Sequence, residues 1–208
     1  MIWLLYIVMG CIALAALLYL FGNYTFWLPF RSAKLPRIVM LHQVTPHEEA
    51  SGMNMPPQKF EQLLQYLVKK RSSFCFVSEL DQYQGQKHVV ALSFDDGFLD
   101  NYQYAYPLLK KYHAKATIYL ATQIEGIEKL APEHIREMSE SGFIEFGAHT
   151  QHHVNLLKLS DDEAYQEMQN SKRDVEALVG HCSGFAYPFG RFNEKHQQKI
   201  AFLLNVIF

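Results

Sequence analysis

The sequence predicts a parallel α/β domain that is preceded by one membrane-spanning helix. Residues 1–30 of the 208-residue chain contain no Asp, Glu, Lys, Arg or His, so every charged side chain lies after them. From residue 36 onward, short β-branched and aromatic runs alternate with segments of helical periodicity, which is typical of βα units around a parallel sheet. With 49% apolar and 19% charged residues, the chain is too hydrophobic to be disordered. We therefore expect an anchor and interfacial segment over residues 1–30 and one domain over residues 31–208.

The anchor is predicted from residues 2–21, which form an almost unbroken apolar run. A helix of about 20 residues is long enough to cross the roughly 30 Å hydrocarbon layer of a bilayer. Trp3 and Tyr6 lie at its start and Tyr24 and Trp27 follow its end, where aromatic rings favour the headgroup zone. A cleaved signal peptide fits less well, because the run has no basic start and no small-x-small cleavage site follows it. We predict an uncleaved, single-pass transmembrane helix.

The charge distribution limits both the partners and the orientation of the chain. The 19 Lys and Arg nearly balance the 21 Asp and Glu, so the formal net charge of −2 offers no broad basic surface to a nucleic-acid backbone. Binding of nucleic acid is therefore disfavoured. Arg31, Lys34 and Arg37 follow the apolar run, and basic flanks tend to stay on the cytoplasmic side of a membrane. This flank favours a domain on the cytoplasmic side.

The elements of the domain follow from local patterns along the chain. Short β-branched or aromatic runs predict strands over residues 37–43, 74–78, 89–94, 117–121, 143–147 and 184–187. After Pro56 and Pro57, apolar residues at helical spacing predict a helix that includes residues 60–68. The same spacing predicts further helices over residues 99–112, 132–141, 161–178 and 193–205. Ser160 and Glu163 have the spacing of a capping box, which predicts a helix that begins at residue 161.

Two adjacent carboxylates, Asp95 and Asp96, end the strand predicted over residues 89–94, and Gly97 follows them. Parallel α/β folds carry their chemistry on the loops at the carboxyl ends of the strands. Two carboxylates a few ångströms apart raise each other's pKa unless a cation compensates their charge, so such a pair suggests a bound cation or a role in proton transfer. Because Asp-Gly is also a common turn dipeptide, this motif alone indicates either a turn or a functional site.

Three histidines, His149, His152 and His153, follow the strand predicted over residues 143–147. His149 and His153 are four positions apart, so both rings can face one side of a tight loop and offer neutral nitrogens to one metal ion. Together with one carboxylate of the Asp pair, they make a two-His, one-Asp ligand set with open positions, as expected of a catalytic ion. We expect His152 to face elsewhere.

A third strand end is predicted near Tyr187, where Pro188, Phe189 and Gly190 form an irregular turn. The backbone N–H groups of such a turn can stabilise a developing oxyanion. By itself, a Pro-x-Gly turn after a strand is ordinary and indicates no function.

Taken together, three ordered motifs resemble those of the polysaccharide deacetylase family, carbohydrate esterase family four, with its nodulation-type chitooligosaccharide deacetylase homology domain. The motifs are Ser93-Phe94-Asp95-Asp96-Gly97, then His149-Thr150-x-x-His153, then Tyr187-Pro188-Phe189-Gly190. The resemblance runs from about residue 36 to residue 208. It implies a distorted (β/α) barrel that hydrolyses the N-acetyl group of N-acetylhexosamine in a polysaccharide or lipid-linked glycan. With the predicted anchor, it implies an enzyme of the bacterial cytoplasmic membrane, although members of the family mostly work outside that membrane.

Carried over residue by residue, the resemblance implies a role for each motif. Asp96, His149 and His153 would bind a divalent metal ion, usually zinc, and Asp95 would be the general base that accepts a proton from water. The backbone N–H of Phe189 matches the position of the family's oxyanion donor. This assignment agrees with the chemistry of the residues, because a divalent cation polarises an amide carbonyl and lowers the pKa of a water.

Two departures from the family pattern leave alternatives open. Ala186 stands where the family often has an arginine that orients the base, for which Arg191 is a possible substitute. The family's later leucine-x-histidine, whose histidine protonates the leaving amine, has no match before Phe208. We therefore expect a barrel that is incomplete at its C-terminus, with His42 as either a local acid or a packed histidine. The alternatives are an impaired domain that binds metal or glycan without turnover and a hydrolase of a different ester or amide.

Overall fold

The structure, a computed structural model, describes residues 2–23 and 35–204 of the chain. The chain divides into two compact units, Met1–Ser32 and Ala33–Phe208. In the first unit the structure describes one helix, α1 (Ile2–Asn23). Among the helices in the described ranges, none combines the length and the apolar character needed to cross a bilayer. The predicted transmembrane helix is thus not supported by the structure, and the other aromatic positions predicted to flank it, Tyr24 and Trp27, lie outside the described residues.

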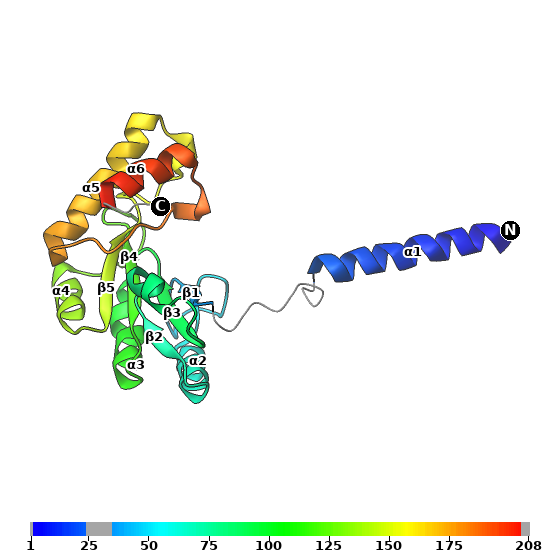
Figure 1. The fold of residues 1–208 in the computed structure, drawn as a ribbon, viewed down its shortest axis with the longest axis horizontal. Coiled ribbons are helices and arrows are strands. Elements are labelled where there is room, and N and C mark those ends of the chain that lie inside the picture. The colour runs from blue at the N-terminus through cyan, green and yellow to red at the C-terminus, as the bar shows by residue number, and fades with distance from the viewer. Residues whose placement is uncertain (1, 24–34, 205–208) are drawn as a thin grey trace. The chain divides into compact units, whose positions relative to one another are not determined.

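The second unit contains a five-stranded parallel sheet (Figure 1). Its strands are β1 (Arg37–Leu41), β2 (Ser73–Cys75), β3 (Val89–Phe94), β4 (Ala116–Leu120) and β5 (Ile144–Ala148). The sheet order is β1-β3-β4-β5, and β2 pairs with the start of β3 while β4 pairs with its end. Every residue of β3, β4 and β5 is buried, which is typical of parallel strands covered on both faces. The parallel α/β class is therefore confirmed.

Five α-helices lie in the described part of this unit, residues 35–204. They are α2 (Pro57–Lys69), α3 (Tyr106–Lys111), α4 (Pro132–Glu140), α5 (Asp161–Val179) and α6 (Glu194–Leu204). Both α4 and α5 contact β5, and α6 packs on α5 (Figure 1). Among the described strands, no pairing joins β1 to β5 to close a barrel. The predicted incompleteness at the C-terminus stays a prediction.

The start of α5 confirms the predicted capping box. The Ser160 hydroxyl accepts a hydrogen bond from the Glu163 backbone N–H at 3.3 Å, and the Glu163 carboxylate accepts one from the Ser160 N–H at 2.9 Å. These bonds satisfy two donors that the first turn of a helix leaves without partners. Because α5 packs on β5, this cap fixes the helix beside the strand that leads to the histidine motif.

The predicted strand over residues 74–78 is wrong in its second half, where a 3-10 helix, Val77–Tyr83, replaces it. Backbone groups there bond to side chains instead of a neighbouring strand. The Val77 N–H donates to the Thr117 hydroxyl at 3.0 Å, and the Ser78 N–H donates to the Glu145 carboxylate at 3.2 Å. Glu145 is buried, so the bond from Ser78 to its carboxylate is strong, and together with the bond from Val77 to Thr117 it redirects the chain.

Two other predicted elements also differ. The segment 184–187 makes only an isolated bridge between Ala148 and Phe185, because Pro188 lacks the N–H that would extend the pairing. The predicted helix over residues 99–112 is split into a π-helical turn, Asn101–Ala105, followed by α3. Pro107 has no N–H to donate to the preceding turn, so regular α-helical bonding cannot run through it. This split places Asp100 and Asn101 against the end of β1.

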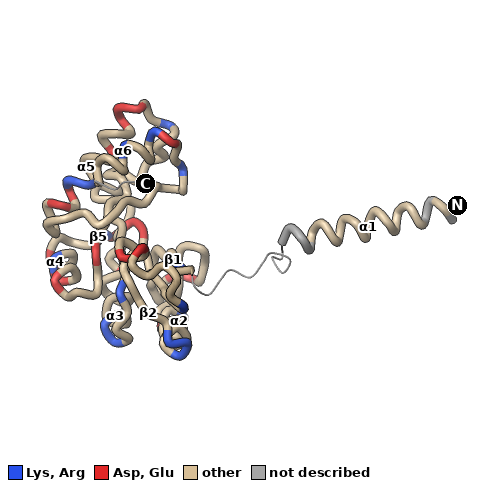
Figure 2. Tube along the Cα trace, viewed as in Figure 1, with Lys and Arg blue, Asp and Glu red and all other residues tan. Residues whose placement is uncertain are grey.

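Charged residues are spread over the second unit rather than gathered on one face (Figure 2). Basic side chains occupy the last turns of α2 and α3. In a βα unit the C-terminal end of a helix lies near the edge where the next strand starts. These basic groups therefore belong to the edge of the sheet opposite the carboxyl ends of the strands, where the candidate site lies.

Candidate metal centre

The two aspartates lie on a sharply turned loop at the end of β3. The Asp95 N–H donates to the Leu41 carbonyl at 3.0 Å, which extends the pairing of β3 with β1 by one residue. Asp96 and Gly97 then both adopt positive φ, at 73° and 81°. The buried strand therefore delivers two adjacent, nearly buried carboxyl groups to the carboxyl edge of the sheet.

Gly97 gives a direct test of how this loop is built. A Cβ at Gly97 would lie 2.6 Å from Leu120 Cδ2, and its φ of +81° disfavours an L side chain. We expect Gly97→Ala to lower the free energy of unfolding by about 2 to 4 kcal/mol, from backbone strain and overpacking together. Urea unfolding monitored by circular dichroism measures this.

Gly126 provides the matched control for Gly97. It has a φ of +78° but open space where a Cβ would lie, so Gly126→Ala carries the backbone cost without the clash. We expect Gly126→Ala to lower the free energy of unfolding by about 1 kcal/mol. Equal losses for the two variants would show that the contact with Leu120 does not constrain the loop.

His149 is held rigidly at the end of β5. Its N–H donates to the Leu120 carbonyl at 2.9 Å, and its Nδ1 lies 2.9 Å from the Ala186 carbonyl. A proton on Nδ1 satisfies that carbonyl and leaves Nε2 free to act as a ligand. His149 Nε2 lies 3.5 Å from Asp96 Oδ1. The backbone carbonyl of Ala186 thus orients the His149 ring, although the side chain of Ala186 is only a methyl group.

His153 completes the cluster from the loop that follows β5. Positive φ values at Thr150 (62°) and His153 (53°) turn this loop back on itself. As a result His153 Nε2 lies 3.3 Å from the same Asp96 oxygen. One potential ligand atom from each of Asp96, His149 and His153 lies within 4.8 Å of the others.

These three residues fit a divalent cation. Asp96 Oδ1 is buried and makes no well-aligned hydrogen bond, although two imidazole nitrogens lie near it. Ligands 2.0 to 2.2 Å from a tetrahedral zinc ion are about 3.3 to 3.6 Å apart, and the two measured nitrogen–oxygen distances are 3.3 and 3.5 Å. An uncompensated carboxylate oxygen at this spacing is better satisfied by an ion than by either histidine.

The electrostatics of the cluster also favour a cation. Burial, and then the charge of Asp96, raise the pKa of Asp95 to about 7. Burial likewise raises the pKa of Asp96. Burial lowers the pKa of His149 to about 3, which keeps the ring neutral, as metal binding requires. A divalent ion would stabilise both carboxylates in their charged form.

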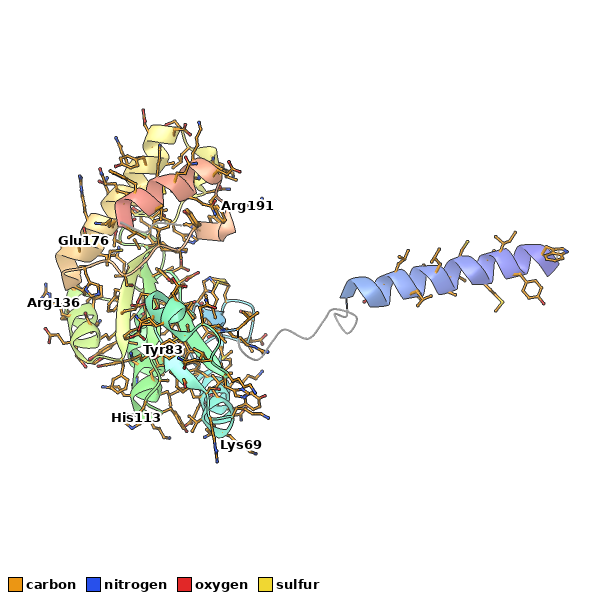
Figure 3. The ribbon with its side chains drawn as sticks, viewed as in Figure 1. Lys69, Tyr83, His113, Arg136, Glu176 and Arg191 are labelled. Atoms are coloured by element: carbon orange, nitrogen blue, oxygen red, sulfur yellow. The ribbon has the colours of Figure 1, made fainter. Side chains whose placement is uncertain are left out.

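Phe189 of the third motif and Arg191, the possible substitute for the family's arginine, lie in different surroundings. Phe189 has a positive φ of 59°, and its ring lies 4.7 Å from the ring of His153, so the turn does meet the cluster. Arg191 lies on the exposed segment before α6 (Figure 3). Within the described residues it forms no ion pair with Asp95, so nothing in the structure gives it the role of orienting the base.

Two further histidines, His152 and His42, differ in their position relative to the cluster. The side chain of His152 is 54% exposed and its Nδ1 lies 2.7 Å from a Glu167 oxygen, so it faces away from the cluster as expected. His42 follows β1, and its half-buried ring interacts electrostatically with Asp96 and His153. Burial lowers its pKa, against the raising effect of Asp96. The sequence leaves His42 as either a local acid or a packed histidine. The structure places it directly after Leu41, whose carbonyl accepts the Asp95 N–H, at the same edge of the sheet as the cluster.

A polar cleft lies at the same edge of the sheet, although Asp96, His149 and His153 are not part of its lining. It has a volume of about 500 Å³ and is formed by the loops that follow β1, β3 and β4. Its lining includes Gln43, directly after His42, and Phe98, directly after the aspartate loop. Hydrogen-bonding side chains on several loops at the carboxyl edge are typical of a binding site for a polar ligand.

Comparisons with known proteins agree with this geometry. Residues 82–203 match the family model described as polysaccharide deacetylase. A Bacillus subtilis (strain 168) protein, YxkH, whose name places it among the polysaccharide deacetylases, is 33% identical over 175 residues, covering 79% of this chain and 60% of its own. The poly-beta-1,6-N-acetyl-D-glucosamine N-deacetylase of Staphylococcus epidermidis is 26% identical over 167 residues, covering 71% of this chain and 57% of its own. The chain thus spans about 60% of the length of these curated relatives.

A solved structure shows the same relationship in three dimensions. The Streptococcus pyogenes deacetylase PplD, in complex with acetate, superimposes with a TM-score of 0.74 and 30% identity, covering 82% of this chain and 80% of that one. The family match includes both the Asp pair and the histidine motif. The chain belongs to the polysaccharide deacetylase family.

Proposed function

We propose that this protein is a metal-dependent hydrolase that removes N-acetyl groups from N-acetylhexosamine residues of a polysaccharide or lipid-linked glycan. The observation that carries the proposal is the convergence of Asp96, His149 and His153, with Asp95 adjacent to them. The names of the relatives support an N-acetylated glycan as the substrate, and the acetate bound to the Streptococcus pyogenes deacetylase is the expected product. The polar cleft at the same edge of the sheet supplies room for the adjoining sugars.

In this proposal Asp96, His149 and His153 hold the ion, and two imidazoles with one carboxylate favour zinc. When bound, the ion polarises the amide carbonyl and lowers the pKa of a water molecule. Asp95 accepts the proton from the attacking water, for which an ionised carboxylate within reach of the cluster is required. The backbone N–H of Phe189 donates to the oxyanion that develops on the former carbonyl oxygen.

His42 is the group that we assign to protonate the leaving amine. It directly follows Leu41, whose carbonyl accepts the Asp95 N–H at 3.0 Å, so it lies at the same edge of the sheet as the aspartate pair. Its buried Nδ1 makes no hydrogen bond to another described residue. The leaving nitrogen must gain a proton as its bond to the carbonyl carbon breaks. In this proposal the protonated form of His42 supplies that proton, Asp95 releases the proton of the water to solvent, and His42 takes one up from solvent after turnover.

The proposal is tested with the full chain loaded with zinc and incubated with N-acetylglucosamine oligomers. Release of acetate together with an equal amount of free amine supports it. Binding of zinc or oligomer without any release of acetate would contradict it and favour the impaired, non-catalytic alternative. Release of acetate from O-acetyl but not N-acetyl sugars would favour the alternative of a different ester substrate.

A location at the bacterial cytoplasmic membrane is a separate part of the proposal. It rests on the uncharged, apolar sequence of residues 1–30 and not on the structure. Fractionation of cells that express the full chain, or the chain without residues 1–30, tests it. We expect only the full chain in the membrane fraction. Recovery of both chains in the same fraction would contradict the proposed location, and a reporter fused after Phe208 would identify the membrane face.

A further inference from the structure

We propose that Asn101, together with Asp100, is a positioning residue that holds His42 in place for proton transfer to the leaving amine. This inference rests on the proposed function, in which His42 is the proton donor. It concerns residues outside the three motifs that define the metal cluster and the base. Its basis is a buried set of hydrogen bonds that joins the segment after the aspartate loop to the residues on both sides of Gln43.

We call the hydrogen bonds from Asn101 and Asp100 to the backbone of His42 and Val44 the clamp. Its first part is the side chain of Asn101. Asn101 is completely buried at the start of the π-helical turn Asn101–Ala105. Its Nδ2 donates to the His42 carbonyl at 2.8 Å and to Asp100 Oδ1 at 2.8 Å. Both donors of the amide group are therefore used, one of them on the backbone of His42 itself.

The second part of the clamp is the carboxylate of Asp100. Asp100 is 8% exposed, and its Oδ1 accepts the N–H of Val44 at 3.0 Å as well as the bond from Asn101. The backbone groups on both sides of Gln43, the His42 carbonyl and the Val44 N–H, are thus tied to two consecutive buried side chains.

The end of the sheet explains why such a clamp is needed. β1 ends at Leu41, whose carbonyl accepts the last bond from β3, the N–H of Asp95. His42 lies one residue beyond this bond, so the strand pairing itself does not fix its backbone. Beyond it, Gln43 is paired with Asn54, and Asp100 and Asn101 bind the Val44 N–H and the His42 carbonyl on either side of Gln43. Because Asp100 lies only three residues after Gly97, these bonds fix the backbone of His42 relative to the aspartate loop.

Two features of Asn101 distinguish it from an ordinary buried side chain. Its Oδ1 is buried without a hydrogen-bond partner, which lowers stability and is unusual in a residue that serves folding alone. It also begins a π-helical turn, a rare form that occurs frequently at functional sites. These features favour a role in aligning the site.

Asn54 is a matched control on the same loop. It is 2% exposed, its Oδ1 accepts the Thr45 N–H at 3.1 Å, and its Nδ2 donates to the carbonyls of Thr45 and Glu48 at 3.2 and 2.8 Å. It therefore shapes the outer part of the loop but makes no bond to His42. Asn54→Ala should cost stability as Asn101→Ala does, without moving the proton donor.

The test is a double-mutant cycle in the zinc-loaded full chain, with N-acetylglucosamine oligomers as substrate. We expect Asn101→Ala to lower kcat about 10- to 100-fold, with KM and zinc content changed less than about twofold. In a His42→Gln background the same change should lower kcat no further, because its effect acts through His42. Asn54→Ala should leave kcat within about twofold of the wild type.

Three results would overturn the inference. The first is that Asn101→Ala lowers kcat by the same factor in the wild-type and His42→Gln backgrounds. The second is that Asn54→Ala lowers kcat as much as Asn101→Ala does, and the third is that Asn101→Ala leaves kcat unchanged. If Asn101→Ala does not fold, Asn101→Leu keeps the side-chain volume and removes the donor. A wild-type kcat for His42→Gln would instead refute the assigned proton donor. No acetate release by the wild type would refute the proposed function itself.

Discussion

Replacement of Asp95 by asparagine is expected to lower kcat for deacetylation by about 10²- to 10⁴-fold while the protein keeps its metal ion. Asparagine has nearly the same shape but cannot accept a proton at neutral pH. The candidate ligand atoms belong to Asp96, His149 and His153, so the binding of an ion should not depend on Asp95. Acetate release measures turnover, and elemental analysis of the same sample measures bound metal. Loss of metal together with turnover would place Asp95 among the ligands instead.

The stability of the same variant separates lost chemistry from lost folding. Without an ion, burial and Asp96 raise the pKa of Asp95 from 3.8 to about 7. A raised carboxyl pKa destabilises the fold progressively as pH increases from about 3.8 to about 7, because only the folded state then retains the proton. Asp95→Asn should therefore be more stable than the ion-free wild type at pH 8, by at most about 4 kcal/mol. The difference should shrink at pH 5, and thermal unfolding at both pH values measures it.

Replacement of His149 by alanine is expected to abolish metal binding and turnover together. His149 is only 2% exposed and its Nε2 faces Asp96, with its other nitrogen fixed by the Ala186 carbonyl. Loss of one of three protein ligands leaves an ion with two, too few for a catalytic zinc site. We expect zinc affinity to fall by more than about 100-fold, since even indirect partners of ligands contribute 10- to 100-fold. Competition with a chromogenic chelator measures the affinity.

His152 is the control for this substitution. It lies in the same loop, but its exposed ring pairs with Glu167 rather than with the cluster. His152→Ala should keep both zinc affinity and kcat within about twofold of the wild type, because exposed pairs of this kind contribute little. If His152→Ala lost the ion as His149→Ala does, the assignment of ligands in this loop would be wrong.

The sequence could predict those parts of the fold that depend on local patterns. The buried strand β3 (Val89–Phe94) has the predicted bounds because its continuous apolar run has only one reasonable interpretation. The start of α5 at Asp161 was also predictable, since the Ser160 and Glu163 cap is a local interaction. The candidate metal ligands were predictable for a related reason, namely that each follows a strand whose carboxyl end meets the same edge of a parallel sheet.

The parts that could not be predicted depend on contacts between residues far apart in the chain. Val77 leaves the strand conformation because its N–H bonds to Thr117, 40 positions away. The clamp on His42 depends on Asn101, 59 positions away, and on a π-helical turn that no periodicity indicates. No local pattern distinguishes His42 as a partner of the cluster from a packed histidine, which is why the sequence left both possibilities open.

X-ray absorption spectroscopy at the zinc edge of the loaded full chain tests the central claim most directly. The account predicts one zinc ion per chain with two imidazole nitrogens at about 2.0 to 2.1 Å and a carboxylate oxygen at about 2.0 to 2.2 Å. The imidazole scattering should disappear in the Asp96→Ala, His149→Ala and His153→Ala variants, and should persist in Asp95→Asn. A sulfur ligand at about 2.3 Å, or an unchanged spectrum in the His149→Ala and His153→Ala variants, would contradict a metal centre built from these residues.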